Sequence, residues 1–375
     1  MKDLPTILQI VPKPPGRWDG VADYALGVAQ KLLEKHGYNT VFATDRTAST
    51  DGINGFKIIS PLTFATRDHP RKKEFDHVIL HYVNYGYQKR GVPISLLPIL
   101  RALRRNCRGR LLTVFHELYA SGPPWKSAFW LRPLQVHIAR SIAHISDGGV
   151  VSSEIMLAQL QRLRPGIRAL VHPVPSNFGE PQLSLDQLSK RSPHRWVICG
   201  GTVLVERSLR SLCRILDKIP PFFWPHELIV LGGSDNPAVR SLVASLAGVR
   251  TDYHPNITAA EASDILSNCS FGWIDYFHRS DVPVAAILKS TAFAALCAHG
   301  VIAVFPHRGS SISVDGNRFP GPYFISGGQQ ELPSVDDRAR VASQIYDWYQ
   351  RCASSAHLGS GIARLLDLPS SGNEV

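Results

Sequence analysis

The stretch 287–305, ILKSTAFAALCAHGVIAVF, decides the fold of the second half of this chain. It predicts a loop, a short helix of small residues that ends near Gly300, and a buried apolar strand. Lys289 comes directly before Ser290 and Thr291, which are suited to begin the helix. Because a helix N-terminus has unpaired N–H groups and a partial positive charge, it attracts phosphate. We therefore expect a diphosphate-bearing ligand in the C-terminal half.

Strand and helix patterns alternate on both sides of this stretch. The expected strands are apolar runs at 6–11, 39–43, 77–82, 111–115, 149–151, 195–199, 228–231, 271–274 and 301–305. Segments with helical spacing separate most of them. Continuous apolar strands joined by helices are typical of parallel sheets that are covered on both faces. The sequence therefore predicts an α/β protein with two Rossmann-like, doubly wound domains facing a cleft.

Domain limits follow from a segment rich in proline and polar residues at 172–194. We expect an N-terminal domain over residues 1–185 and a C-terminal domain over 186–340. The last segment, 341–375, is expected to form a helix and tail that could pack back on the first domain.

Bulk composition excludes several classes of protein. The chain has 375 residues, 44% of them apolar, and no apolar run of the length that spans a membrane. The N-terminal sequence lacks the zones of a signal peptide. Six cysteines are scattered without a CxxC pair, which favours reduced thiols over structural zinc. These features predict a cytoplasmic protein, with a peripheral position on the inner face of a membrane as a further possibility.

Charge is concentrated in the first half of the chain. Residues 1–190 hold 25 Lys and Arg against 14 Asp and Glu, which accounts for the whole net charge of +11. A basic face of this kind attracts anionic lipid headgroups or acidic glycans, although it can also be an ordinary solvated surface. Nucleic acid is not expected as a partner, because aromatic residues are not interleaved with the basic runs.

Polar residues follow two strands of the first half. The loop that contains Gly16, Asp19 and Gly20 comes after the first strand, and its glycines permit close approach of another molecule. It is not the GxGxxG motif, so a nicotinamide cofactor is disfavoured. His116 and Glu117 end the fourth strand, where they could bind sugar hydroxyls or transfer a proton. The alternative for the glycine loop is an ordinary flexible loop, and the alternative for His116 is a structural role.

Two loops of the second half are candidates for binding the diphosphate-bearing ligand. Gly201 and Thr202, followed by Arg207, offer backbone N–H groups and a guanidinium to phosphate, although a tight turn is the competing explanation. Asp275, Tyr276 and Arg279 follow the strand at 271–274. Asp275 could accept hydrogen bonds from sugar hydroxyls, and Arg279 adds a cation beside Lys289.

The sequence resembles glycosyltransferases of the GT-B fold, of the family 4-like type, over nearly its whole length. Five segments carry the resemblance: GRWDGVADYALGVAQKL (16–32), LLTVFHELYASG (111–122), CGGTVLVERSLRSL (199–212), YHPNITAAEASDILSNCSFGWIDY (253–276) and ALCAHGVIAVF (295–305). They are similar to the family's glycine loop, its strand ending in histidine, its diphosphate segment, its nucleobase segment and its AMAxGxPVI run.

Two family carboxylates are absent from this chain. The family usually has an E-x7-E pair before AMAxGxPVI, and alignment on Gly300 places these positions at Ile287 and Ala295. Of the family's diphosphate cations only Arg207 is kept, and Lys289 is suited to replace the missing charge. The resemblance therefore implies a divergent branch.

The predicted function is transfer of a sugar from a nucleotide diphosphate sugar to a saccharide or lipid-linked acceptor. Catalytic roles are expected for His116, Glu117, Lys289 and Arg207. The resemblance implies retention at the anomeric carbon without a metal, and no cofactor is expected. Two alternatives stay open: a nucleotide-sugar epimerase of GT-B fold, and a non-catalytic protein that binds a sugar or nucleotide. Polysaccharide assembly is the pathway that the resemblance suggests.

Overall fold

The computed structural model describes residues 4–15, 20–44, 52–59, 75–120, 122–277, 283–326 and 329–368. The chain divides into two compact units. The first consists of Met1–His172 together with Ser355–Val375, and the second of Pro173–Ser354.

These limits differ from the expected boundaries after residues 185 and 340. The segment from Pro173 joins the second unit, because the Val174 N–H donates to Leu288 O over 2.9 Å and the Ser176 N–H to Tyr349 Oη over 2.8 Å. The helix at 338–352 also belongs to the second unit. Hydrogen bonds and packing, which proline content alone does not reveal, decide both limits.

Within the described residues, the first unit contains a seven-stranded parallel sheet in the order β3-β2-β1-β4-β5-β6-β7. Its strands are β1 (Thr6–Val11), β2 (Asn39–Thr44), β3 (Lys57–Ile59), β4 (His77–Tyr82), β5 (Leu111–Phe115), β6 (Gly148–Val151) and β7 (Ala169–Val171). Its helices are α1 (Gly20–His36), α3 (Asn84–Tyr87), α4 (Leu96–Asn106), α5 (Ser127–Ile145), α6 (Glu154–Leu163) and α13 (Ser355–Asp367). The order reverses between β1 and β4, which makes their carboxyl ends a topological switch point.

The second unit repeats this plan. Its described residues form a seven-stranded sheet in the order β10-β9-β8-β11-β12-β15-β16, in which only β16 is antiparallel to its neighbour. These strands are β8 (Arg195–Cys199), β9 (Glu227–Leu231), β10 (Arg250–His254), β11 (Phe271–Trp273), β12 (Ile302–Phe305), β15 (Tyr323–Ser326) and β16 (Gln329–Glu331). The second switch point lies between β8 and β11.

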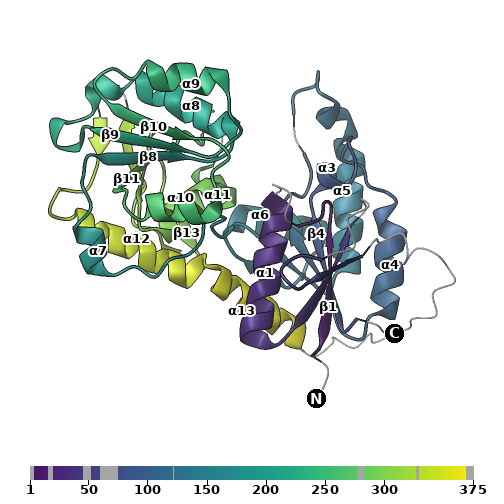
Figure 1. The fold of residues 1–375 in the computed structure, drawn as a ribbon. Coiled ribbons are helices and arrows are strands. Elements are labelled where there is room, and N and C mark those ends of the chain that lie inside the picture. Colours follow the sequence, from purple (N-terminus) through teal and green to yellow (C-terminus); the bar gives the residue numbers. More distant parts are fainter. Residues whose placement is uncertain are drawn as a thin grey trace. The chain divides into compact units, whose positions relative to one another are not determined.

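Helices of both the α and the 3₁₀ type connect the strands of the second unit (Figure 1). They are α7 (Leu185–Ser189), α8 (Thr202–Cys213), η1 (Leu216–Lys218), η2 (Pro221–Phe223), α9 (Pro237–Ala244), α10 (Ala259–Leu266), η3 (Val284–Lys289), α11 (Thr291–Ala298) and α12 (Arg338–Cys352). A short hairpin, β13 (Ser313–Val314) and β14 (Asn317–Arg318), completes the unit. Thr258 and Glu261 form a capping box at the start of α10.

The two-domain, Rossmann-like α/β fold that the sequence predicted is therefore present. The apolar strands form the two cores, and their side chains are almost wholly buried, as in β5 (Leu111–Phe115) and β12 (Ile302–Phe305). All six cysteines are free, and four of them are buried. Among the described helices, none combines the length and the apolar character that crossing a bilayer requires.

The last helix, α13, returns to the first unit and lies beside α1, yellow against purple in Figure 1. Its glycines make close packing possible. A Cβ at Gly359 would lie 3.0 Å from Lys31 Cβ, and one at Gly361 would lie 2.5 Å from Leu170 Cδ2. Tyr38 Oη also donates to Asp367 Oδ1 over 2.5 Å. The C-terminal segment thus belongs to the first unit from Ser355 onward, and Arg110 Nε donates to Leu368 O just past α13 over 2.9 Å.

Candidate functional site

The turn after β8 is built from glycines that pack against the turn after β9. Gly200 has a φ of +140°, and a Cβ at Gly232 would lie 2.7 Å from Gly200 O. A Cβ at Gly233 would lie 2.7 Å from Thr202 Oγ1, the atom that accepts the Ser234 N–H over 2.9 Å. Thr202 therefore joins the two turns.

Gly201 differs from its neighbours in this turn. It is the exposed N-cap of α8 with an ordinary φ of −71°, and a Cβ placed on it would meet no atom within 4 Å. Packing inside the protein does not require glycine there. Close approach of another molecule to its backbone is one remaining reason for it.

Arg207 joins α8 to the loop after β11. Its Nε donates to Asp275 O over 2.5 Å and its Nη2 donates to Tyr276 O over 3.3 Å. The Asp275 N–H donates to Ser208 Oγ over 3.0 Å. Because α8 begins at Thr202, Arg207 lies inside the helix and not at its start. Its position fixes the loop backbone, and contact with a phosphate stays a prediction.

Asp275 carries the least satisfied polar group of this loop. The residue is 5% exposed, and its Oδ1 has no hydrogen-bond partner among the described residues. The His307 imidazole is close by, with its Nε2 3.9 Å from Oδ1, beyond hydrogen-bond distance. An unpartnered buried carboxylate oxygen costs free energy, so it is a strong pointer to a ligand. The sequence offered only a weak signal for His307, two residues past the end of β12.

Tyr276 follows Asp275 in the same loop and is half-buried. Burial raises the pKa of its phenol, and nearby Arg207 opposes the rise. Its ring meets the ring of Phe277 edge to face, with centroids 5.5 Å apart. Arg279, the third predicted residue of this loop, lies outside the described residues.

At the start of α11, the Ser290 amide and hydroxyl both make hydrogen bonds within the protein. The Ser290 N–H donates to Ile287 O over 2.8 Å, and Ser290 Oγ accepts the Phe293 N–H over 3.2 Å. The Ser290 amide is therefore occupied, which corrects the expectation that it binds phosphate. Thr291 is half-buried and Lys289 is exposed at the end of η3, so their predicted roles remain open.

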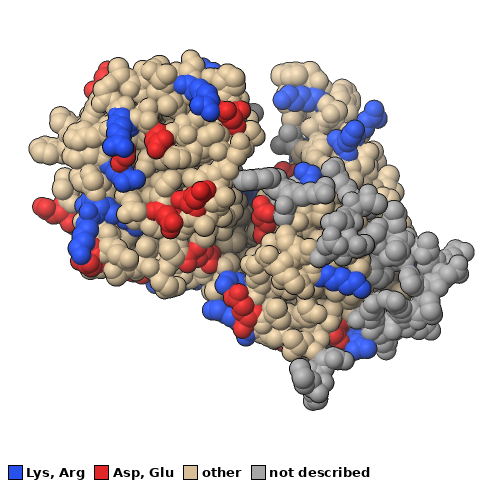
Figure 2. Space-filling model, viewed as in Figure 1, with Lys and Arg blue, Asp and Glu red and all other residues tan. Residues whose placement is uncertain are grey.

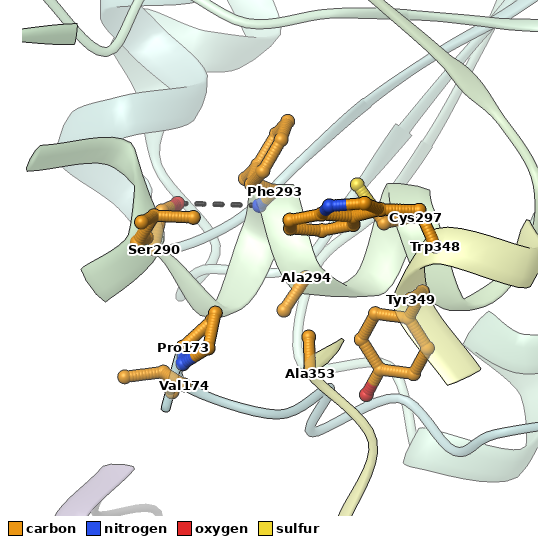
Figure 3. Close-up of a pocket in the computed structure, with 10 residues that line it drawn as sticks. Pro173, Val174, Ser290, Phe293, Ala294, Cys297, Trp348, Tyr349 and Ala353 are labelled. Atoms are coloured by element: carbon orange, nitrogen blue, oxygen red, sulfur yellow. Dashed lines mark hydrogen bonds between the residues drawn. The ribbon is translucent and has the colours of Figure 1, made fainter. Parts of the chain in front are cut away.

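A small pocket lies on the inner side of this helix start (Figure 3). Its volume is about 10 Å³, far below the 300 Å³ or more of typical ligand pockets. Phe293, Trp348 and Tyr349 contribute most of its aromatic lining. It lacks the polar groups that a sugar diphosphate needs, so we assign it to core packing.

The positions of the missing family carboxylates are also in the core. Ile287 and Ala295 are fully buried. A glutamate at either position would be desolvated without a partner for its charge, so apolar residues suit these positions. Any ribose contact must come from other residues.

The first unit holds a chain of buried polar groups at its own switch point. His81 in β4 is fully buried, and its Nε2 lies 2.8 Å from Gln9 Oε1 in β1. Gln9 Nε2 in turn donates to Thr40 Oγ1 over 3.5 Å. These contacts assign Oε1 to the side of His81, so His81 Nε2 carries the proton that it donates.

His116, at the end of β5, completes this chain. Its Nε2 lies 3.3 Å from His81 Nδ1, and the two rings are stacked with centroids 5.6 Å apart. Burial, with a smaller effect from His116, lowers the pKa of His81 well below its usual value, so His81 is neutral. His81 Nδ1 then accepts the His116 Nε2–H. The Tyr24 ring packs edge-on against His116 at 4.9 Å.

The other residues predicted in the first unit are Glu117, Gly16, Asp19 and Gly20. Glu117 is exposed beside half-buried His116. Gly20 is exposed and begins α1. Gly16 and Asp19, from the same predicted loop, lie outside the described residues. Within the described part of the chain, no group of three or more His, Cys, Asp or Glu side chains is placed to hold a metal ion.

Comparison with solved structures defines the class of fold. A glycosyltransferase from Rickettsia africae is similar with a TM-score of 0.57 and 12% identity, covering 97% of this chain and 98% of that one. An E. coli trehalose-6-phosphate structure bound with UDP-2-fluoro glucose gives a TM-score of 0.56 and 11% identity, with coverages of 97% and 99%. A third similar structure is a putative UDP-N-acetylglucosamine 2-epimerase from Listeria monocytogenes. Its TM-score is 0.50 and its identity 11%, and the match covers 98% of this chain and 99% of that one.

These likenesses extend over both units, so this chain has the two-domain GT-B fold of glycosyltransferases. The identities are too low to carry more than the fold. No protein-family model matches the sequence. No curated protein matches it either.

Proposed function

We propose that this protein transfers a sugar from a nucleotide diphosphate sugar to a saccharide or lipid-linked acceptor. The observation that carries the proposal is the unpartnered Asp275 carboxylate at the switch point of a GT-B second domain. In open α/β sheets, ligands bind beyond the carboxyl ends of strands at such a point. A carboxylate there is suited to accept hydrogen bonds from sugar or ribose hydroxyls.

The second unit is the donor side in this proposal. Lys289, the Thr291 amide and Arg207 would stabilise the diphosphate leaving group, and Thr202 would add a hydroxyl. Gly201 would let the donor approach the backbone. The charge on the leaving group grows in the transition state, so donors held in place beforehand lower the barrier. Tyr276 and Arg279 would complete the donor contacts.

The first unit is the acceptor side. His116 would contact the transferred sugar, held in orientation by the chain from Gln9 through His81. Exposed Glu117 would act as a base or bind the acceptor. The loop with Gly16, Asp19 and Gly20 would approach the acceptor from the end of β1.

We propose retention of anomeric configuration. We also propose no requirement for a metal, because protein cations would offset the negative charge of the diphosphate leaving group. The test is activity in EDTA with sugar analysis of the product. Loss of transfer in EDTA that Mg²⁺ or Mn²⁺ restores would contradict metal independence. Inversion at the anomeric carbon would contradict retention.

A nucleotide-sugar epimerase is the second candidate, favoured by the structural likeness to the Listeria protein. An epimerase turns over a free sugar nucleotide without any acceptor. A non-catalytic binding protein is the third, favoured by the apolar residues at Ile287 and Ala295. Such a protein would bind a nucleotide tightly without turnover on any acceptor.

Thermal shift against UDP, GDP, ADP and their sugars tests the proposal first. A ligand at 100 times its Kd stabilises the folded protein by about 2.7 kcal/mol, with no knowledge of the acceptor needed. We expect one nucleotide class to raise the Tm and Asp275→Asn to reduce that rise. The matched control is Asp264→Asn, an exposed acid on α10. No shift from any nucleotide would overturn the donor site.

A further inference from the structure

Among the residues of the first unit that the structure describes, the most exposed aromatic side chains gather at the start of α5. Trp125 is 83% exposed and Trp130 is 71% exposed. Phe129 and Leu134, 42% and 49% exposed, lie on the same stretch. Large apolar groups concentrated on one exposed segment mark an interaction surface, whereas single ones need no explanation.

This aromatic group, Trp125, Phe129, Trp130 and Leu134, is held in a fixed arrangement. The Trp130 Nε1–H donates to Pro124 O over 2.7 Å, and the Lys126 N–H donates to Pro123 O over 2.9 Å. The Phe129 and Trp130 rings meet edge to face with centroids 5.3 Å apart. Because the indole N–H is satisfied internally, the ring can enter an apolar environment without losing a hydrogen bond to water.

The helix itself has two distinct faces. Ile138, Ala139 and Ile142 are buried against the sheet. Trp130 and Leu134 stand four residues apart on the exposed side, where neighbours on one helix face recur. Figure 1 shows α5 at the top of the first unit, where its N-terminal end projects away from the sheet. The exposed face is therefore not needed for the fold.

The charged residues along this stretch of the sequence, between Glu117 and Asp147, are all basic. From Leu118 to Ser146 the sequence has Lys126, Arg132 and Arg140 and no acidic residue. All three cations are exposed, and the Arg132 guanidinium lies over the Tyr119 ring at 5.5 Å. Figure 2 shows Lys and Arg atoms among tan ones in the region of α5.

A second basic segment adjoins α5. Gln135 Nε2 donates to Arg90 O over 3.2 Å and to Tyr85 Oη over 3.3 Å. This contact brings exposed Lys89 and Arg90 to the helix. The surface thus combines insertable aromatic rings with a basic surround.

We propose that this surface docks the protein on a membrane that contains anionic lipid. Trp and Phe side chains favour the level of the headgroups, and Lys and Arg are attracted to anionic headgroups. A second copy of this chain is a poorer occupant, because a two-fold contact through this face would oppose the same cations. Docking is separate from the reaction proposed above, since it is measured without a sugar nucleotide.

Co-sedimentation with vesicles tests the proposal. Vesicles of phosphatidylcholine alone are compared with an equimolar mixture of phosphatidylcholine and phosphatidylglycerol. We expect binding to the anionic vesicles, weakened by added salt because screening acts on the headgroup attraction. Equal binding to both vesicles, or binding to neither, would overturn the proposal.

Two variants identify the residues. Trp125→Ala with Trp130→Ala should weaken vesicle binding at least about tenfold, since both rings lose their insertion. Lys126→Gln with Arg132→Gln should weaken it about fivefold for each charge removed. The matched controls are Phe222→Ala, 74% exposed on the second unit, and exposed Arg250→Gln on β10. Both controls should bind as the unchanged protein does.

Two further measurements separate folding and self-association from docking. Thermal unfolding should be unchanged in every variant, because each substituted side chain is exposed. Brominated lipids should quench the fluorescence of the bound protein, and less so in the double tryptophan variant. If that variant changes the oligomeric state in sedimentation velocity while vesicle binding stays normal, the surface binds protein and the membrane assignment is wrong.

Discussion

His81 Nδ1 lies 3.3 Å from His116 Nε2, although the two residues belong to different strands, β4 and β5. The pair is directional, because Gln9 Oε1 accepts a hydrogen bond from the His81 Nε2–H, which leaves Nδ1 as an acceptor. His116 therefore carries a proton on Nε2. Hydrogen bonds inside the sheet thus set which tautomer a strand-end histidine presents.

Replacement of His81 by Phe should test this positioning role. The variant keeps an aromatic ring in the core but removes the acceptor, so His116 loses the bond that sets its tautomer. We expect kcat to fall about tenfold, because orientation of His116 by one hydrogen bond is worth about 1.4 kcal/mol, with little change in KM. Side-chain ¹⁵N NMR should find the His116 proton on Nε2 only while His81 is present. An unchanged tautomer in the variant would show that His81 is merely a packing residue.

Asp275→Asn should separate stability from ligand binding. Removal of a buried carboxylate with an unpartnered oxygen should leave the Tm unchanged or raise it. Donor affinity should fall at least about tenfold, the 1.4 kcal/mol worth of one charge-assisted hydrogen bond. Calorimetric unfolding and titration with the sugar nucleotide measure the two quantities. A loss of stability with unchanged affinity would assign Asp275 to the fold alone.

Gly201→Ala and Gly233→Ala form a second matched pair. Alanine at Gly233 (φ +69°) would clash with Thr202, so we expect a loss of about 1–3 kcal/mol in the free energy of unfolding. Alanine at Gly201 meets open space at an ordinary φ, so stability should be kept. If the donor approaches Gly201, its affinity should nonetheless fall. Full affinity in Gly201→Ala would mean that no ligand comes near this turn.

Lys289→Ala tests the proposed stabilisation of the leaving group. The residue is exposed at the end of η3, so folding should be unaffected. We expect kcat to fall about 10²-fold, as when one preorganised donor is lost from a transition state. Lys190→Ala, an exposed lysine on the same unit, is the control. Turnover equal to that of the control would remove Lys289 from the mechanism.

Acid should destabilise the second unit through His299. Burial lowers the pKa of His299 to about 4 from its ordinary value of 6.5. Its Nδ1–H donates to Ala295 O over 2.7 Å, and its Nε2 accepts from Ser263 Oγ over 2.8 Å. The folded protein therefore binds this proton less readily than the unfolded chain does.

The sign of the effect follows from proton linkage. Stability from neutral His299 is fully present above pH 6.5 and is lost as the pH falls toward about 4, by about 1.4 kcal/mol per pH unit. Denaturant unfolding at a series of pH values measures the slope. His299→Gln, which cannot bind the proton, should flatten that slope over this range. A variant as acid-sensitive as the original chain would assign the sensitivity to other groups.

Much of the fold could be read from the sequence because its central strands are continuous apolar runs. The edge strand β10 was missed because it has no apolar run. It pairs only with β9, so its sequence RTDYH needs no apolar run. The helix α13 was missed because Gly359 and Gly361 weaken a helical pattern, yet they allow the close packing seen in the structure.

The candidate site was predictable in type but not in detail. Strand ends identified Asp275 and His116, since ligands bind there in parallel sheets. The role of Arg207 could not be read in this way, because its bonds reach a loop 68 residues further along the chain. Ser290 was misjudged, since a sequence does not show that an amide is already hydrogen-bonded.

The sequence alone determined two parallel sheets, the loops at their carboxyl ends and the basic character of the first half, because these depend on local periodicity and composition. Only the tertiary structure decided that Asp275 Oδ1 is left without a partner, that His81 orients His116, and that Trp125 and Trp130 are exposed together. Burial and hydrogen-bond partners depend on residues distant in the chain, so no local pattern encodes them.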